Sequence, residues 1–521
     1  MAVGPTLGTG VFIGAGQALA IGGPASLLIS YLFLSLLTYF MATTIAEVAA
    51  YTPSRHGTMV TNGFRYMTTS MGFAAACLRW YAMAMFVPYE ISTAMVNLGL
   101  WNPGSAIGIR LVIITSIIVG FNYLPEKLFK SSEVIFTRVK IGTLVCLLVL
   151  SLSIGMGGAT GHDHWGFQYW KSPGAMHEYL TRGSLGRFWG LLQCLLHSSI
   201  AFTFAPELIV HRAELSETAD QTETTDNIEP TGNSKIPNNV FADVGTTAFP
   251  YILSSVAMGV MAPYNEPLLT NNGAGSGLSP FVVGINTAKI RILPVTATIA
   301  IFISSVASGR SFLYLASRVL CAMAEVGHAP RILKNRNTWG VPWVAVTATA
   351  TFALLAFLSV GTSSSVVTNY FILFVNSSGY LSWLISCVVL RRFRQQLKLN
   401  HADNSGSFKI QPLGAYLGFV LSVVLLLANG LSSAVPGNQT GPRAARIFFA
   451  YISIPLFLVT YLVHRLRNSG PRQSHRGEGS LKETCRDPAI RYHPGWVQPS
   501  QGTDPPSPIE LEQVWIMARE S

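Results

Sequence analysis

The sequence predicts an all-α integral membrane protein with about 12 transmembrane helices. Half of its residues are hydrophobic, only 11% are charged, and the mean hydropathy is +0.40, whereas a soluble domain carries about 25% charged residues. The 521 residues leave room for about a dozen spans of roughly 20 residues each. Composition and length therefore exclude a soluble globular protein and favour a chain that crosses a membrane many times.

Apolar runs follow one another along almost the whole chain. The predicted spans cover residues 2–21, 26–49, 72–98, 106–122, 138–157, 188–210, 246–262, 293–318, 342–360, 366–390, 413–433 and 446–465. Lysine and arginine gather in alternate connections, which is typical of cytoplasmic loops. These residues are Arg55, Arg65, Lys127, Lys130, Arg331, Lys334, Arg336, Arg391, Arg392, Arg394 and Lys398. Both termini are then expected on the cytoplasmic side.

Residues 1–466 are expected to form one transmembrane domain. The segment of about residues 214–240 is polar and is interpreted as a disordered cytoplasmic insertion, and residues 467–521 are interpreted as a disordered cytoplasmic tail. The net charge of +11 gathers at span ends, so it is a topology signal and does not indicate nucleic acid as a partner. Six scattered cysteines without a CxxC pair predict no metal site, and no cofactor is expected.

The first apolar run contains three glycines within seven residues, Gly8, Gly10 and Gly14. Glycine weakens a helix, and at membrane depth loosened backbone is tolerated only where it is buried in protein or lines a water-filled cavity. An interrupted helix that lines a cavity is therefore expected here. The alternative is that these small residues only permit close helix packing.

Short motifs occur in a fixed order along the chain. They are Gly8-Thr9-Gly10-Val11-Phe12, Glu47 ahead of Tyr51-Thr52-Pro53, Pro88-Tyr89-Glu90, Gly166-Phe167-Gln168-Tyr169-Trp170, Ser279-Pro280-Phe281-Val282-Val283, Ala316-Ser317-Arg318, Gly327-His328-Ala329-Pro330, Gly340-Val341-Pro342 and Gly379-Tyr380-Leu381-Ser382-Trp383. Together they resemble the fungal amino acid permeases of the amino acid, polyamine and organocation (APC) superfamily. The resemblance covers about residues 4–466, and the joint order is far more specific than any single motif.

The resemblance implies a LeuT-like fold: a 5+5 inverted repeat with broken helices 1 and 6, and two further helices. Helix ends at such breaks carry partial charges that can hold a carboxylate and an ammonium group, so an amino acid zwitterion is the implied ligand. Amides around Thr9 and Gly10 would hold the carboxylate, and carbonyl groups would hold the ammonium. The implied binding residues are Thr6, Gly8, Thr9, Gly10, Ala201, Phe202 and Phe204.

The sixth span departs from the family pattern. Ala205 stands where relatives usually have glycine, and Pro206 takes a position normally held by a small or polar residue. Because proline lacks an amide hydrogen and can itself break a helix, the interruption is expected to persist by a different device.

Ionisable residues in or near the spans are candidates for coupling or gating, because a charge at membrane depth is costly unless it is paired or faces a cavity. Glu133 and Lys140 resemble a fifth-helix motif whose lysine takes the place of a sodium ion at the broken first helix, which implies proton coupling at Lys140. The alternative is that Lys140 snorkels to the membrane surface. The resemblance implies that Glu47 and Glu207 lie near a cytoplasmic gate, where either could be purely structural. It also implies that Glu90 contacts the substrate or binds a proton.

Arg310 lies inside the eighth span, where relatives commonly carry a small polar residue. It could form an ion pair with an acidic side chain of the substrate, or with a glutamate of the protein such as Glu90. The sequence does not choose between these two partners.

The sequence thus predicts a secondary active transporter that carries amino acids across the plasma membrane by proton symport with alternating access. Its expected partners are the amino acid substrate, the proton and the lipid bilayer, with neutral substrates favoured over acidic ones. The alternative is a transport-defective nutrient sensor or a truncated paralogue, because only seven residues precede Gly8 where the family has a longer segment. No paired catalytic carboxylates, nucleophile motif or phosphate loop is visible, so an enzyme is not expected.

Overall fold

The structure is a computed structural model that describes residues 10–51, 58–99, 107–157, 166–222, 236–270, 277–289, 292–399, 408, 410–434 and 441–468. Within these ranges every regular element is a helix. The helices are η1 (Gly10–Gly14), α2 (Ala15–Tyr51), α3 (Thr58–Tyr66), α4 (Thr69–Gly99), α5 (Ile107–Phe121), α6 (Glu126–Gly155), η2 (Trp170–Gly174), α7 (Ser184–Ser198), η3 (Ser199–Ala201), α8 (Ala205–Thr222), α9 (Ile236–Met261), η4 (Pro267–Thr270), α10 (Pro280–Thr287), α11 (Leu293–Glu325), η5 (Arg331–Lys334), α12 (Trp343–Ala350), η6 (Thr351–Val360), α13 (Ser364–Leu399), α14 (Leu413–Ala434), α15 (Arg443–Tyr451) and α16 (Ser453–Asn468).

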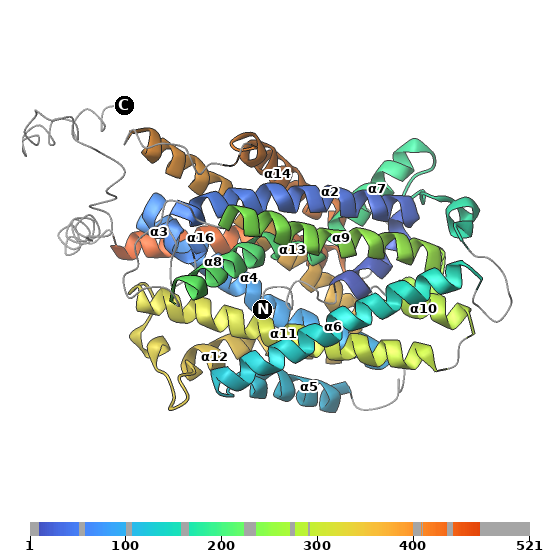
Figure 1. Cartoon of the computed structure of the whole chain (residues 1–521), viewed down its shortest axis with the longest axis horizontal. Coiled ribbons are helices and arrows are strands. Elements are labelled where there is room, and N and C mark those ends of the chain that lie inside the picture. The colour runs from blue at the N-terminus through green and yellow to red at the C-terminus, as the bar shows by residue number, and fades with distance from the viewer. Residues whose placement is uncertain are drawn as a thin grey trace, which may run out of the picture.

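Most of the long helices run roughly along the longest axis of the molecule (Figure 1). In the part of the chain that is described, nine helices are long and apolar enough to cross a membrane, or ten when the bent pair of α15 and α16 counts as one span. The predicted all-α membrane class is confirmed. The predicted fourth span corresponds to α5, a shorter apolar helix of 15 residues.

The first two predicted spans meet at Gly23, where non-helical backbone (φ 82°, ψ 172°) divides α2 ahead of Pro24. The loop before α7 covers this point: Ala25 N–H donates to the Ala175 carbonyl (2.9 Å), and His177 N–H donates to the Gly22 carbonyl (3.0 Å). A Cβ atom at Gly23 would lie 2.9 Å from the Ala175 oxygen. Glycine is therefore required here both by the positive φ and by the close approach of the loop.

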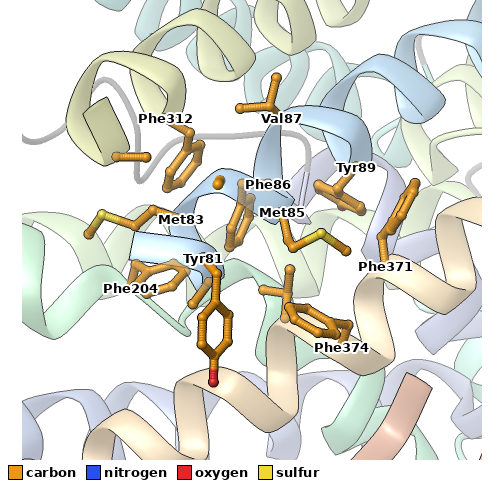
Figure 2. Packing of buried hydrophobic residues seen from close by; sticks show 14 of the residues in the cluster. Tyr81, Met83, Met85, Phe86, Val87, Tyr89, Phe204, Phe312, Phe371 and Phe374 are labelled. Carbon is orange, nitrogen blue, oxygen red and sulfur yellow. The ribbon is translucent and has the colours of Figure 1, made fainter. Parts of the chain in front are cut away.

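The helix α4 lies at the centre of the largest apolar cluster and packs against α11, α13, α16 and η6. Figure 2 shows Phe86 of α4 among aromatic side chains from other helices. Its ring stacks on Phe312 of α11, with centroids 4.2 Å apart, and meets Phe204 edge-on at 5.3 Å. This cluster joins α4 to the segment between α7 and α8, where the candidate site lies.

The predicted insertion of residues 214–240 is partly helical. The helix α8 continues to Thr222 and α9 begins at Ile236, so helical backbone extends into both ends of this segment. Its remaining residues, 223–235, and the predicted tail from residue 469 onward lie outside the described ranges.

Candidate substrate and coupling site

The sixth predicted span is interrupted in its middle. The helix α7 ends at Ser198, η3 covers Ser199–Ala201, a turn follows at residues 202–204, and α8 begins at Ala205. Pro206 is the second residue of α8, a position that suits proline because the first amide hydrogens of a helix have no helical partner. We define residues 199–204 as the interrupted segment.

The interrupted segment lies directly against the first helix. A Cβ atom on Gly10 would be 2.9 Å from Ala201 Cα and 3.1 Å from Ala201 N, so the two backbones touch where only glycine leaves room. Gly10–Gly14 forms a π-helical turn in which every residue is buried. Of the predicted binding residues, Gly10 and Ala201 are brought together, while Thr6, Gly8 and Thr9 lie outside the described residues.

Phe202 and Phe204 point into different clusters. Phe202 packs edge-on against Tyr31 (5.4 Å) and Tyr251 (5.0 Å), whereas Phe204 packs against Phe86 on the other side. Their carbonyl groups accept hydrogen bonds from Ala205 N–H (3.0 Å) and Leu208 N–H (3.1 Å). Each carbonyl oxygen has a second lone pair, so both can still accept a hydrogen bond from an ammonium group.

Lys140 of α6 is buried, and its Nζ donates to Ser308 Oγ of α11 at 2.6 Å. The carboxylates of Glu133 and Glu90 and the guanidinium of Arg310 all interact electrostatically with it. Glu90 of α4 faces the same stretch of α11, because a Cβ atom on Gly309 would lie 3.3 Å from Glu90 Cβ. Two candidate carboxylates and two cations from three helices therefore form one buried cluster, which we call the charge cluster: Glu90, Glu133, Lys140 and Arg310. Lys140 does not snorkel.

Arg310 forms its ion pair with Glu133, at 2.5 Å between Nη2 and Oε2. Its Nη1 donates to Ser132 Oγ at 2.6 Å, and Ser311 Oγ donates to the same Glu133 oxygen at 2.8 Å. The guanidinium carbon also lies 4.5 Å and 4.6 Å from the ring centroids of Phe129 and Phe136. The sequence analysis expected a substrate carboxylate or a glutamate such as Glu90. Helices α4 and α6 both pack against α11, and the glutamate on α6 is the one within ion-pair distance of the guanidinium.

Glu47 and Glu207 are both buried and both form ion pairs. Glu47 of α2 accepts two hydrogen bonds from Arg394 of α13, at 2.6 and 2.8 Å. Glu207 of α8 lies 2.7 Å from Arg79 of α4 and accepts a hydrogen bond from Ser382 of α13 at 2.6 Å. These contacts join α2 to α13, and α8 to α4 and α13.

Neither arginine partner, Arg394 or Arg79, was among the candidate site residues predicted from the sequence. Arg394 was assigned to a loop after residue 390, but α13 continues to Leu399, so Arg394 stands on a helix that packs against α2. Arg79 lies within the predicted third span, and a cation inside an apolar run is itself a signal of a paired or functional residue. A cavity between α2, α3, α4 and α13 adjoins the Glu207–Arg79 pair and is lined by Thr44, Ile45, Val48, Asn62, Gly63, Ala75, Arg79, Ser382, Ile385, Ser386 and Val389.

The described ranges contain nine apolar helices that could cross a membrane, an interrupted span and ion pairs buried between helices. These features are typical of membrane transporters. A family model for amino acid permeases matches residues 1–475, and the chain belongs to this family. It is a multi-pass membrane protein, and its family supports amino acid transport as its activity.

Among curated relatives, a probable proline-specific permease of Schizosaccharomyces pombe is 33% identical over 88% of this chain and 82% of that protein. A proline-specific permease of Emericella nidulans is also 33% identical, over 96% of this chain and 90% of that protein. Crystal structures of a manganese transporter of Eremococcus coleocola cover 90% of this chain and 94% of that chain at 13% identity, with TM-scores of 0.52 and 0.53. This last likeness concerns the fold alone.

Proposed function

We propose that this protein imports small neutral amino acids, with proline as the first candidate, by proton symport across the plasma membrane. The proposal includes twelve spans arranged as a LeuT-like 5+5 inverted repeat with two further helices, both termini in the cytoplasm, and alternating access to a midplane site. The proline-specific relatives support the choice of substrate. A general amino-acid permease of Saccharomyces cerevisiae, 29% identical over 89% of this chain, supports the wider class.

The contact between Gly10 and Ala201 is the observation that carries the proposal. It joins the first helix to the interrupted segment, so backbone amide and carbonyl groups from two helices converge without a charged side chain of their own. Such groups can hold the carboxylate and the ammonium of a zwitterion. The apolar clusters on either side of the interrupted segment, to which Phe202 and Phe204 belong, give it apolar surroundings that suit a substrate body such as a pyrrolidine ring.

The pairing of Arg310 with Glu133 favours neutral substrates. A substrate carboxylate would have to displace a buried carboxylate and two hydroxyl contacts, because Ser132 and Ser311 belong to the same network. Breaking a buried ion pair leaves an uncompensated charge, which is strongly unfavourable. Acidic amino acids are therefore not the proposed cargo.

We assign proton coupling to Lys140. Its ammonium is held by Ser308 within the charge cluster, and an ammonium can release its proton while a guanidinium does not. In the proposed cycle, Lys140 gains and loses contacts as the gate closes and opens. Its protonation is thereby linked to the side of the membrane from which the substrate site is accessible. Opening toward the cytoplasm would also separate the ion pairs Glu47–Arg394 and Glu207–Arg79, which we assign to the cytoplasmic gate.

Uptake of labelled amino acids by cells that lack their own permeases tests this function. We expect concentrative proline uptake that rises as external pH falls, collapses with a protonophore and does not depend on sodium. Uptake that requires sodium would contradict proton symport. Surface expression without uptake of any amino acid would favour the nutrient-sensor alternative.

Substitutions at Lys140 test the coupling role. Lys140→Met should retain substrate binding but lose accumulation, and Lys140→Arg should not restore it, because the guanidinium keeps its proton. The matched control is Lys130→Met on the same helix, since Lys130 forms only an exposed ion pair with Glu126. Full accumulation by the Lys140→Met variant would exclude Lys140 as the coupling residue.

A further inference from the structure

The interruption of the sixth span leaves backbone carbonyl groups that need hydrogen-bond donors from outside the helix. The last carbonyl groups of a helix have no helical partner, and inside a membrane protein such groups must find one within the protein. Leu196 lies in the last turn of α7, and Thr203 lies in the turn before α8. Both residues flank Ala201, which touches Gly10.

Side chains of α13 donate hydrogen bonds to the carbonyl groups of both Leu196 and Thr203. Asn376 Nδ2 donates to the Leu196 carbonyl at 2.7 Å, and Trp383 Nε1 donates to the Thr203 carbonyl at 3.1 Å. Thr203 Oγ1 donates to the Ser199 carbonyl at 2.8 Å and lies 3.3 Å from Asn376 Oδ1. All three side chains are buried. The last turn of α7 and the turn before α8 are thus attached to one helix, on either side of Ala201.

The same face of α13 also touches the segment sterically. Residues three and four apart share one face of a helix, which places Gly379 between Asn376 and Trp383. A Cβ atom on Gly379 would overlap Thr203 Cγ2. We call these three residues of α13, namely Asn376, Gly379 and Trp383, the α13 clamp.

Resting on the proposed amino acid site, we infer that the α13 clamp positions the interrupted segment, so that the affinity for substrate depends on residues that do not touch the substrate. Two hydrogen bonds fix the backbone at Leu196, just before the segment, and at Thr203 within it, and Gly379 fixes how closely the segment approaches α13. The carbonyls of Ala201, Phe202 and Phe204 are carried between these fixed points. A small displacement of the segment would therefore move the groups proposed to hold the ammonium.

Two substitutions remove the hydrogen bonds with little change of volume. Trp383→Phe keeps an aromatic ring but removes the N–H donor, and Asn376→Leu keeps the approximate size but removes the amide. Either change leaves a buried carbonyl without its donor. We expect the KM for proline uptake to rise by about tenfold in each variant, the size expected when one such group loses its partner, with the maximal rate per surface molecule less affected.

The chain supplies a matched control for each variant. Trp80 is a second tryptophan with a hydrogen-bonded indole: it is half-buried, and its Nε1 donates, at 3.1 Å, to the hydroxyl of Thr349. Asn429 is another buried asparagine whose Nδ2 donates to the carbonyls of Leu373 (3.0 Å) and Ala450 (3.4 Å), neither of which belongs to the interrupted segment. Trp80→Phe and Asn429→Leu should leave the KM unchanged. A loss of folded protein shared by all four variants, without a KM change specific to the clamp, would overturn the inference.

A second measurement does not require transport. Hydrogen exchange of the purified protein should be faster at residues 199–204 in both clamp variants than in the parent, and unchanged there in both control variants. Failure of the parent to take up any amino acid would contradict the proposed function while leaving this measurement to decide on the clamp. Equal exchange in the parent and in both clamp variants would overturn the clamp even if the parent transports proline.

Discussion

Arg310 is fully buried, and its guanidinium is held by Ser132 and Glu133 of α6 between aromatic rings. Removing one member of a buried ion pair leaves the other charge without compensation, whereas replacing both members by uncharged groups of similar size is often tolerated. This difference between removing one charge and removing both distinguishes an arginine in a structural ion pair from an arginine that binds the substrate. Only a structural pair should recover when both charges are removed.

We expect Arg310→Met to destabilise the protein by about 3–5 kcal/mol, because Glu133 would remain as an unpaired buried carboxylate. Adding Glu133→Gln to Arg310→Met should restore much of that loss. Thermal unfolding of the purified protein in detergent measures both effects. A double variant no more stable than Arg310→Met would show that Glu133 is not the partner that matters.

Gly10 gives a second test at the level of one residue. Gly10→Val should abolish proline uptake with surface expression largely retained, because its Cβ atom would press on the Ala201 backbone and a β-branched residue restricts the loosened helix. Gly142→Val is the control, since a Cβ atom on Gly142 meets nothing within 4 Å. Normal uptake by Gly10→Val with unchanged KM would remove the main support for the site.

Four elements meet at two histidines, each of which stacks on a phenylalanine. His328, in the segment after α11, stacks on Phe64 of α3 with centroids 4.1 Å apart. His464 of α16 stacks on Phe73 of α4 at 4.4 Å, and the two imidazole centroids are 5.9 Å apart. Ser70 Oγ lies 3.1 Å from His464 Nδ1, and Arg467 of α16 is a further cation acting on His464. We call this arrangement the histidine junction.

Burial lowers the pKa of His328 below its ordinary value of 6.5, and the nearby His464 lowers it further. A histidine with a depressed pKa in the folded state binds fewer protons than in the unfolded state. Its contribution to stability is therefore complete above about pH 6.5 and declines as the pH falls below that value.

We expect acidification from about pH 7.5 to about pH 5.5 to lower the hydrogen-exchange protection factors of α3 and α16, which the junction joins. Protection factors compare each measured rate with the intrinsic amide rate at the same pH, so they remove the intrinsic pH dependence of exchange. The double variant His328→Phe, His464→Phe should lose this pH dependence, while His177→Phe, in the loop before α7, should keep it. Protection factors of α3 that do not change with pH in the parent would contradict the junction as a pH-sensitive contact.

Several elements could be predicted from the sequence, and the reasons are local. Long apolar runs predict membrane helices because the bilayer sets their length, and Pro206 predicts the interruption because proline breaks a helix without help from its neighbours. The pairing of helices could not be predicted in this way. Glu90 and Glu133 are equivalent candidates for Arg310 in the sequence, and since α4 and α6 both pack against α11, only the side-chain positions identify Glu133 as the partner. Arg394 could not be predicted as a partner because α13 is longer than its apolar run.

At the scale of the whole molecule, the proposed orientation can be tested by surface labelling. In intact cells, a membrane-impermeant thiol reagent should label Arg182→Cys, in the exposed loop before α7, and should not label Arg331→Cys, in the segment after α11. The proposed cytoplasmic position of Arg331 predicts that permeabilisation exposes it. Labelling of Arg331→Cys in intact cells would reverse the proposed orientation.

The molecule as a whole was predictable to the level of its class and its family. Composition is sufficient for the membrane class, and the ordered motifs were sufficient for the amino acid permeases, which the family match over residues 1–475 confirms. The site was predictable only where a family motif or a helix breaker marked it. The α13 clamp carries no such mark, because Asn376 and Trp383 acquire their partners from a segment more than 170 residues away.

The charge cluster also has an electrical consequence. Its formal charges cancel while Lys140 holds its proton, because two carboxylates face two cations. In a cycle that carries the proton on Lys140, a loaded site with a zwitterionic substrate crosses without net charge, and the empty site returns with one negative charge. A membrane potential acts on a moving charge with about 2.3 kcal/mol per 100 mV for a full crossing. An inside-negative voltage would therefore accelerate the return of the empty carrier, leaving the loaded step indifferent to it.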